Sequence, residues 1–259
     1  MDNKTNIIRK VPDEFPQTPN LANYEKAYKE FSWDKVRNEI DFFKDGKINI
    51  AYNLVDRHTK NGKGDKIALY FKGKNGEKEE YSFTDLTKKS NKFANVLTSL
   101  SVEKGDRVFI FLPTIPERYV SFIGTLKTGA IVSTMFSAFQ EMALLDRLSD
   151  SSAKIVITNA DLFPRIKKVW KNLPALEKVI IVERGSSDFP KGDNLFSYDK
   201  EMQNANSEFE IVHLDENDLS YMLYTSGTTG KPKGVVHAHI DTLQAIMTTK
   251  YVLDVKDDD

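Results

Sequence analysis

Residues 108–132, VFIFLPTIPERYVSFIGTLKTGAIV, set the pattern on which the rest of the chain is built. The apolar run 108–112 has the length and the β-branched and aromatic content of a buried strand. Pro116 suits the first turn of a helix, where its missing N–H leaves no hydrogen bond unmade, and Gly129 is typical of a helix end. Residues 131–132 then begin another strand. A strand, a crossover helix and a second strand favour a parallel β-sheet.

The amino-terminal side of this stretch continues the alternation of strand and helix. Asn75-Gly76 predicts a hairpin that joins strands at residues 67–71 and 77–82. Ser82 and Asp85 have the spacing of a capping box, in which each side chain accepts a hydrogen bond from an otherwise unpaired amide. The helix that follows is expected to bury one apolar face, made of Leu86, Phe93, Ala94, Leu97 and Leu100.

The carboxyl-terminal side repeats the unit. Residues 154–158 and 179–182 are predicted strands, and residues 162–173 are the predicted helix between them. Residues 184–193, rich in Gly, Ser and Asp, are expected to form a loop. The sequence therefore predicts an α/β fold with a mainly parallel sheet and flanking helices.

Composition excludes several function classes. The chain has 259 residues, of which 40% are hydrophobic, and its net charge of −1 offers no basic surface for nucleic acid. It has no cysteine, which excludes disulfides, thiolate metal sites and a cysteine nucleophile. The charged amino terminus does not resemble a signal peptide, and no apolar run is long enough to span a membrane. We expect a cytoplasmic protein with no membrane partner.

The most informative stretch is residues 219–237, LSYMLYTSGTTGKPKGVVH. An apolar strand leads into a segment of hydroxyls, glycines and lysines, and a second strand follows. Glycines let backbone amides approach phosphate oxygens, hydroxyls add donors and lysines add positive charge. We therefore predict a site for the phosphates of a nucleotide, with these residues as its members: Thr225, Ser226, Gly227, Thr228, Thr229, Gly230, Lys231, Lys233 and Gly234.

Three other kinds of loop fit these residues less well. The P-loop of NTPases needs a glycine where Thr225 stands and a Ser or Thr where Pro232 stands. A dinucleotide-binding fingerprint fails because the glycine expected two residues before Gly227 is missing. An ordinary Ser/Thr/Gly hairpin loop is equally compatible with the composition, and the order of the residues favours the phosphate loop over it.

The eleven residues from Tyr224 to Gly234 resemble the phosphate-binding motif of the adenylate-forming superfamily, which includes acyl-CoA synthetases, peptide-synthetase adenylation domains and luciferases. Residues 102–108, 113–117, 129–136 with Phe139, and 146–148 are similar to other parts of these enzymes. Residues 23–25 and 31–33 resemble the lead-in of bacterial acetyl-CoA synthetases in particular. The resemblance covers the chain from about residue 20.

The resemblance implies an AMP-forming ligase that activates acetate or another short carboxylate. The carboxylate attacks the α-phosphorus of Mg²⁺-bound ATP to give an acyl-adenylate and pyrophosphate, and coenzyme A then displaces AMP. The loop would hold the β- and γ-phosphates as a positioning element, so no catalytic acid or base is assigned. The family's adenine, ribose, magnesium and acyl sites lie beyond this loop, so we expect the isolated chain to be catalytically incomplete and its partner to be the remainder of the enzyme. The alternative is a non-catalytic nucleotide-binding or regulatory module.

Two further groups were considered. Arg165 and Lys168 lie on a predicted helix and, by resemblance, are candidates for binding coenzyme A, although a solvated helix face is the simpler interpretation. His237 and His239 would share one face of a strand, but no third ligand is evident, so no metal site is predicted.

The predicted domain organisation has three parts and no small carboxyl-terminal domain. Residues 1–48 are a helical lead-in, residues 49–210 an α/β region, and residues 211–259 a strand–loop–strand–helix segment of the same large domain. In the lead-in, Tyr24, Ala27, Tyr28 and Phe31 are spaced as one face of a helix.

Overall fold

The computed structural model describes residues 20, 21, 23–184, 189–225 and 230–255. The chain divides into two compact units, residues 41–240 and a smaller unit made of residues 1–40 and 241–259. Each unit is described by itself. The three-part division predicted from the sequence stays a prediction, because it concerns the architecture of a whole family rather than contacts within this chain.

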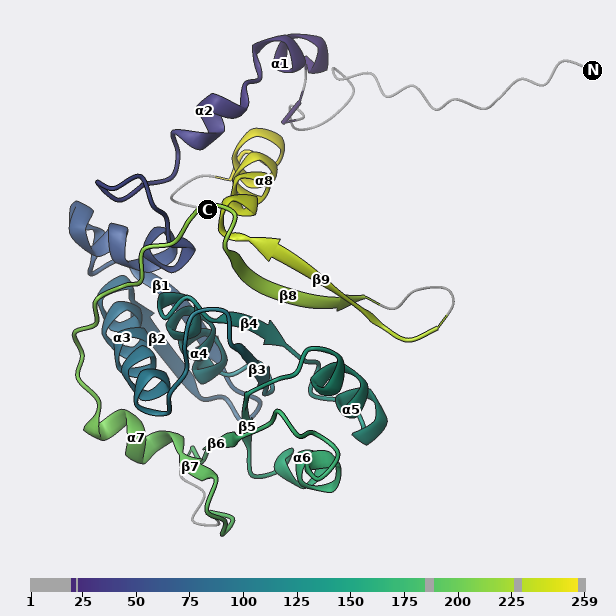
Figure 1. The fold of residues 1–259 in the computed structure, drawn as a ribbon. Helices are drawn as coiled ribbons and strands as arrows, with labels where there is room; N and C mark the ends of the chain where they lie inside the picture. Colours follow the sequence, from purple (N-terminus) through teal and green to yellow (C-terminus); the bar gives the residue numbers. More distant parts are fainter. Residues whose placement is uncertain (1–19, 22, 185–188, 226–229, 256–259) are drawn as a thin grey trace, which may run out of the picture. The chain divides into compact units, whose positions relative to one another are not determined.

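The larger unit is a twisted sheet with helices on both faces (Figure 1). Its strands run in the order β7-β6-β5-β3-β4-β8-β9, and every neighbouring pair is parallel except β8 and β9. The strands are β3 (Arg107–Phe111), β4 (Ile131–Thr134), β5 (Ile155–Asn159), β6 (Lys178–Val182), β7 (Leu195–Ser197), β8 (Leu219–Thr225) and β9 (Lys233–Ala238). The predicted α/β class with a mainly parallel sheet is confirmed.

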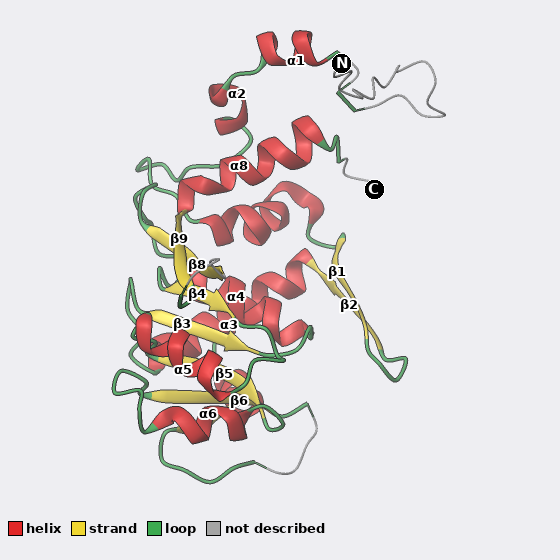
Figure 2. Cartoon of the chain, turned by 90° about the vertical axis from the view of Figure 1, so that its right-hand side faces the viewer, coloured by secondary structure: helices red, strands yellow, loops and turns green. Residues whose placement is uncertain are grey.

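Helices connect the strands and cover the sheet (Figure 2). They are α3 (Phe83–Ser99), α4 (Pro116–Lys127), α5 (Glu141–Asp150), α6 (Phe163–Trp170) and α7 (Tyr198–Asn204), with π-helical turns at Tyr52–Asp56 and Thr59–Lys63. A separate antiparallel hairpin consists of β1 (Ile67–Lys72) and β2 (Lys78–Ser82). Its turn contains Gly76 at φ +93°, a left-handed conformation that favours glycine.

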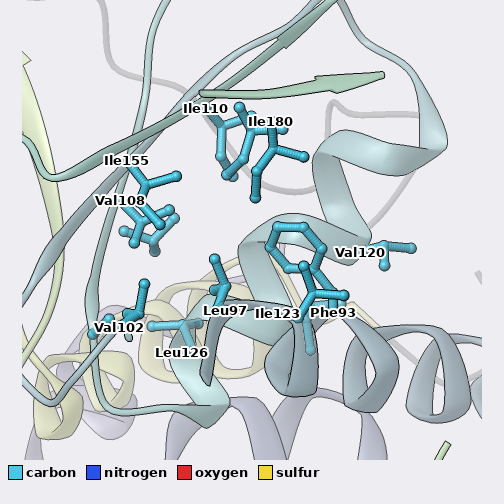
Figure 3. Close-up of a cluster of buried hydrophobic side chains, with 14 of the residues drawn as sticks. Phe93, Leu97, Val102, Val108, Ile110, Val120, Ile123, Leu126, Ile155 and Ile180 are labelled. Carbon is cyan, nitrogen blue, oxygen red and sulfur yellow. The ribbon is translucent and has the colours of Figure 1, made fainter. Parts of the chain in front are cut away.

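Alternate residues along the strands contribute side chains to two apolar cores, one on each face of the sheet. Val108 and Ile110 of β3 pack with Phe93, Leu97 and other side chains of α3 and α4 (Figure 3). Phe109 and Phe111, which point the other way, pack against α5 and α6. Burial on both faces explains why this strand is continuously apolar rather than alternating.

Local sequence signals explain where the helices that line these cores begin and end. Ser82 and Asp85 form the predicted capping box, with the Ser82 Oγ accepting from the Asp85 amide at 3.1 Å and Asp85 accepting from the Ser82 amide at 3.0 Å. Pro116 occupies the first turn of α4 as predicted, and Gly129 follows the helix at φ +77°. The predicted helix 162–173 is shorter than expected, because after Trp170 the chain continues in turns.

The smaller unit contains α1 (Tyr24–Glu30), α2 (Trp33–Arg37), α8 (Thr242–Ile246) and the π-helical turn Met247–Val252. The 3-10 turn His239–Asp241 crosses the boundary, with His239 in the larger unit. The helix predicted from the spacing of its aromatic residues is confirmed as α1, and Asn23 caps it by accepting from the Lys26 amide. No helix in the described ranges combines the length and apolar character needed to cross a membrane.

Gly124 of α4 packs closely against α3. A methyl group built on it would lie 2.8 Å from the Ser90 carbonyl oxygen and 2.9 Å from the Phe93 ring. We expect Gly124→Ala to lower the free energy of unfolding by about 1–3 kcal/mol, because the helices must separate to admit the methyl group. Urea unfolding measures this, with Lys88→Ala on the exposed side of α3 as control. Equal stability of the two variants would contradict the close packing.

Candidate nucleotide-binding site

The predicted phosphate loop joins β8 to β9 at the carboxyl end of β8. Because β8 is parallel to β4, the loop lies at the edge of the sheet where the parallel strands end. In open α/β sheets this edge is where ligands bind. The two strands on either side of the loop were predicted from the sequence and are confirmed, and they pair as an antiparallel hairpin that Thr225 and Lys233 close.

Five of the nine predicted loop residues lie within the described part of the chain: Thr225, Gly230, Lys231, Lys233 and Gly234. Ser226, Gly227, Thr228 and Thr229 lie outside the described residues. Gly230 has φ +98°, a conformation that would strain any residue with a Cβ. The assignment of all nine residues to a phosphate site stays a prediction.

Gly234 has a packing role that its sequence pattern does not reveal. It lies opposite Tyr224 in the hairpin, and a Cβ there would come within 3.0 Å of the Met222 Sδ and 3.2 Å of the Tyr224 Cζ. The Tyr224 ring therefore lies across the position that a side chain at residue 234 would occupy. This glycine lets the tyrosine lie flat against the hairpin at the base of the loop.

Tyr224 and Lys231, before and after the central part of the loop, both contact α5. The Tyr224 hydroxyl donates to Asp150 Oδ2 at 2.7 Å and lies 3.2 Å from the Arg147 carbonyl oxygen. Burial, and next the bond to Asp150, raises the pKa of Tyr224, so its hydroxyl remains protonated at neutral pH. The Lys231 ammonium, which is largely exposed, lies 3.3 Å from Asp146 Oδ1.

Arg165 and Lys168, the candidates for binding coenzyme A, lie on α6 and face the turn between β4 and α5. Arg165 Nη1 donates to the carbonyl oxygens of Ser137 and Phe139, at 2.8 and 3.0 Å. Lys168 pairs with Glu141 at 2.6 Å and lowers the pKa of that carboxyl group. Both residues thus help to hold this turn, and their role toward coenzyme A stays a prediction.

His237 and His239 lie in different surroundings. His237, on β9, stacks against Tyr221 with ring centroids 4.5 Å apart. His239 follows the end of β9 and is fully buried, with Nδ1 accepting a hydrogen bond from the Ile50 amide at 3.1 Å. Among the described residues, no group of three His, Cys, Asp or Glu side chains could hold a metal ion. The burial of the His239 ring and its hydrogen bond to the Ile50 amide therefore indicate a structural role.

Comparison with known proteins assigns this arrangement to a family. Residues 56–259 match the family described as AMP-binding enzyme, so that the match includes the sheet and the entire loop. The chain belongs to the AMP-binding enzyme family. The acetyl-coenzyme A synthetase of Bacillus subtilis is 40% identical over 241 residues, covering 93% of this chain and 41% of that protein. That of Methanothrix thermoacetophila is 37% identical, covering 95% and 39%.

Solved structures agree with the family assignment. The crystal structure of Brucella canis acyl-CoA synthetase superposes with a TM-score of 0.81 at 25% identity, over 91% of this chain and 42% of that one. The predicted resemblance to adenylate-forming enzymes is thereby confirmed. This AMP-binding family chain spans about two fifths of the length of the curated relatives it matches.

Sequence reasoning missed the residues that connect the loop of this AMP-binding family member to α5. Arg147 and Asp150 were not predicted as site residues, and Tyr224 was noted only as the first residue of the motif. One signal was present: Arg147 falls between Leu144 and Leu148 on the apolar face of a helix, where a charged side chain is unusual.

Proposed function

We propose that this chain forms the ATP-phosphate-binding part of an AMP-forming acyl-CoA ligase that activates acetate or another short carboxylate. The observation that supports this most directly is the placement of the Thr225–Gly234 motif between β8 and β9, at the carboxyl edge of a parallel sheet in a chain of the AMP-binding family. Relatives named acetyl-coenzyme A synthetase support the choice of substrate.

The chemistry follows from the charges that the reaction moves. When the carboxylate attacks the α-phosphorus, negative charge develops on the departing pyrophosphate. Loop amides, hydroxyls and the ammonium group of Lys231 or Lys233 would stabilise that charge at fixed positions, which costs no reorganisation during the reaction. Mg²⁺ would arrive with ATP, and we assign no residue of the chain to it. These residues position the nucleotide and transfer no proton.

A binding measurement tests the role of the loop. We expect the chain to bind Mg·ATP, and Lys231→Ala or Lys233→Ala to weaken binding by about ten- to a hundredfold, because a charge-assisted contact contributes roughly 1.5–3 kcal/mol. Isothermal titration calorimetry measures the affinity, and Lys78→Ala on the separate β1–β2 hairpin is the control. The proposal would be refuted if the unsubstituted chain did not bind Mg·ATP, or if both lysine variants bound it as tightly as the unsubstituted chain.

We further propose that residues 1–259 alone do not complete ligation, since relatives that carry the name acetyl-coenzyme A synthetase are more than twice as long. Acetate-dependent exchange of pyrophosphate into ATP is the appropriate assay, because it reports the adenylation step without coenzyme A. We expect no exchange above background. Robust exchange by the purified chain would overturn this part of the proposal and leave the ATP site intact.

For coenzyme A we propose Arg165 and Lys168 as contacts to its phosphates. Arg165 binds backbone carbonyls through one guanidinium nitrogen, and Lys168 is well exposed, so both retain donors for an anion. A loss of coenzyme A affinity in Lys168→Ala but not in Lys171→Ala, on the same segment, would support this. Equal affinity of Lys168→Ala and Lys171→Ala for coenzyme A would refute this assignment.

A further inference from the structure

The loop clamp is the set of α5 side chains Asp146, Arg147 and Asp150 that contact the hairpin at both ends of the phosphate loop. Asp150 binds Tyr224, the residue before Thr225, and Asp146 pairs with Lys231 on the other side. In Figure 1, α5 lies below the loop end of the β8–β9 hairpin. A single helix turn therefore contacts both sides of the loop.

Arg147 is the buried centre of this clamp. Only 8% of the residue is exposed, and its guanidinium carbon lies 4.2 Å from the centroid of Phe139 and 5.7 Å from that of Tyr224. A cation near two aromatic rings is attracted to their π faces. The stack connects the turn before α5 to the tyrosine at the base of the loop.

The hydrogen bonds of Arg147 do not account for its presence in the core. Nη1 donates to the Ala143 carbonyl oxygen at 2.8 Å, but Nε is buried and has no hydrogen-bond partner among the described residues. No carboxylate is paired with the guanidinium in the described ion pairs, and burying an unpaired charge is costly. An apolar side chain of similar length would fill this position at lower cost, which indicates a role beyond packing.

Tyr224 connects Arg147 to the loop. Its ring contacts the guanidinium, its hydroxyl is bound to α5, and its Cζ lies where it would meet a Cβ at residue 234 at 3.2 Å. The ring is thus fixed on three sides. Because Tyr224 immediately precedes Thr225, its orientation sets the direction in which the chain enters the loop.

We propose that Arg147 is a positioning residue for the phosphate loop: by holding Tyr224, it fixes the point at which the chain enters the loop, at Thr225, for the binding of a nucleotide triphosphate. This inference rests on the proposed ATP site. Preorganised groups bind more tightly than mobile ones because less conformational freedom is lost on binding. On the other side of the loop, the exposed pair Lys231–Asp146 holds the lysine against α5, and phosphate would replace the carboxylate when a nucleotide binds.

The test compares two arginines in the full chain. Arg147→Met keeps the length of the side chain and removes the charge, and Arg57→Met, at a half-buried arginine, is the control. Arg57 also donates to an uncharged acceptor, Asn53 Oδ1 at 3.2 Å, but it follows the Tyr52–Asp56 turn and does not lie on α5. Tyr224→Phe, which loses only the hydroxyl, is expected to have an intermediate effect.

Two readouts separate positioning from general destabilisation. We expect Arg147→Met to weaken Mg·ATP binding by about tenfold and to speed tryptic cleavage of the Lys233–Gly234 bond relative to the Lys74–Asn75 bond of the β1–β2 hairpin. Arg57→Met should leave both readouts unchanged, and Arg147→Lys should restore part of the affinity.

Unchanged affinity and cleavage in Arg147→Met, or equal changes in both methionine variants, would overturn the inference. So would faster cleavage with unchanged ATP affinity, because the clamp would then not act on nucleotide binding. If the unsubstituted chain binds no ATP, the proposed function fails, and the cleavage comparison still shows whether Arg147 holds the loop.

Discussion

Replacing Lys127 with methionine is expected to lower the free energy of unfolding by about 3–5 kcal/mol, the largest effect of any substitution considered. The Lys127 side chain is fully buried at the end of α4, and its ammonium donates to Asp56 Oδ1 at 2.8 Å and to Asn91 Oδ1 at 2.7 Å. Removing it leaves the Asp56 carboxylate buried without its only described side-chain partner. Chemical denaturation with urea measures the loss.

The physical reason is that burial disfavours the charged form of both Asp56 and Lys127. Burial raises the pKa of Asp56 and lowers that of Lys127, while their mutual attraction acts in the opposite direction on each. Such a pair adds little to stability when intact, yet breaking it exposes the full desolvation cost of the remaining charge. The network also connects the Tyr52–Asp56 turn to α3 through Asn91, so the loss affects three elements.

Two controls make this prediction specific. The double variant Lys127→Met/Asp56→Asn should recover most of the lost stability, because no unpaired charge remains. Lys104→Met, which breaks an exposed pair with Asp218, should cost no more than about 1 kcal/mol. A double variant as unstable as Lys127→Met would show that packing, rather than the stranded carboxylate, causes the loss.

Much of the fold could be predicted because its signals are local. The capping box of Ser82 and Asp85, Pro116 at a helix start and Asn75-Gly76 at a hairpin turn each act within a few residues. The strand pattern on both sides of the phosphate loop is likewise contained in one short segment. These features depend on contacts between residues that are near one another in the sequence.

Other features depend on pairings that no local pattern encodes. β4 pairs with β8, so that Val132 lies beside Tyr221, although a large part of the sheet separates them along the chain. Lys127 occupies a helix end, where a lysine is ordinarily exposed and favoured by the helix dipole, and only the tertiary fold buries it. Arg147 became a candidate only when α5 was placed beside Tyr224.

His239 should make the protein lose stability in mild acid. Burial lowers the pKa of this residue from 6.5 to about 4, a shift that Asp218 partly opposes and Lys104 increases. Its Nδ1 accepts a hydrogen bond from the Ile50 amide, which a proton on that nitrogen would break. The folded chain therefore keeps the ring neutral at pH values where the unfolded chain protonates it.

The sign and size follow from this difference in proton binding. Above pH 6.5 the ring is neutral in both states and contributes no pH dependence. As the pH falls from 6.5 to 4, the unfolded state binds a proton that the folded state excludes, and the free energy of unfolding decreases by roughly 3 kcal/mol in total. Urea titrations at intervals across this window measure the slope.

His239→Gln isolates the contribution of this ring, because the glutamine carbonyl oxygen can accept the Ile50 hydrogen bond and does not titrate. In this variant the decrease between pH 6.5 and 4 should be largely abolished, whereas His237→Gln, on the adjacent strand, should retain it. A His239→Gln profile that matches the unsubstituted chain would show that other groups cause the acid sensitivity. A flattened profile would establish that the end of β9 is held to Ile50 by a histidine that must stay neutral, which connects the hairpin carrying the phosphate loop to the body of the sheet domain.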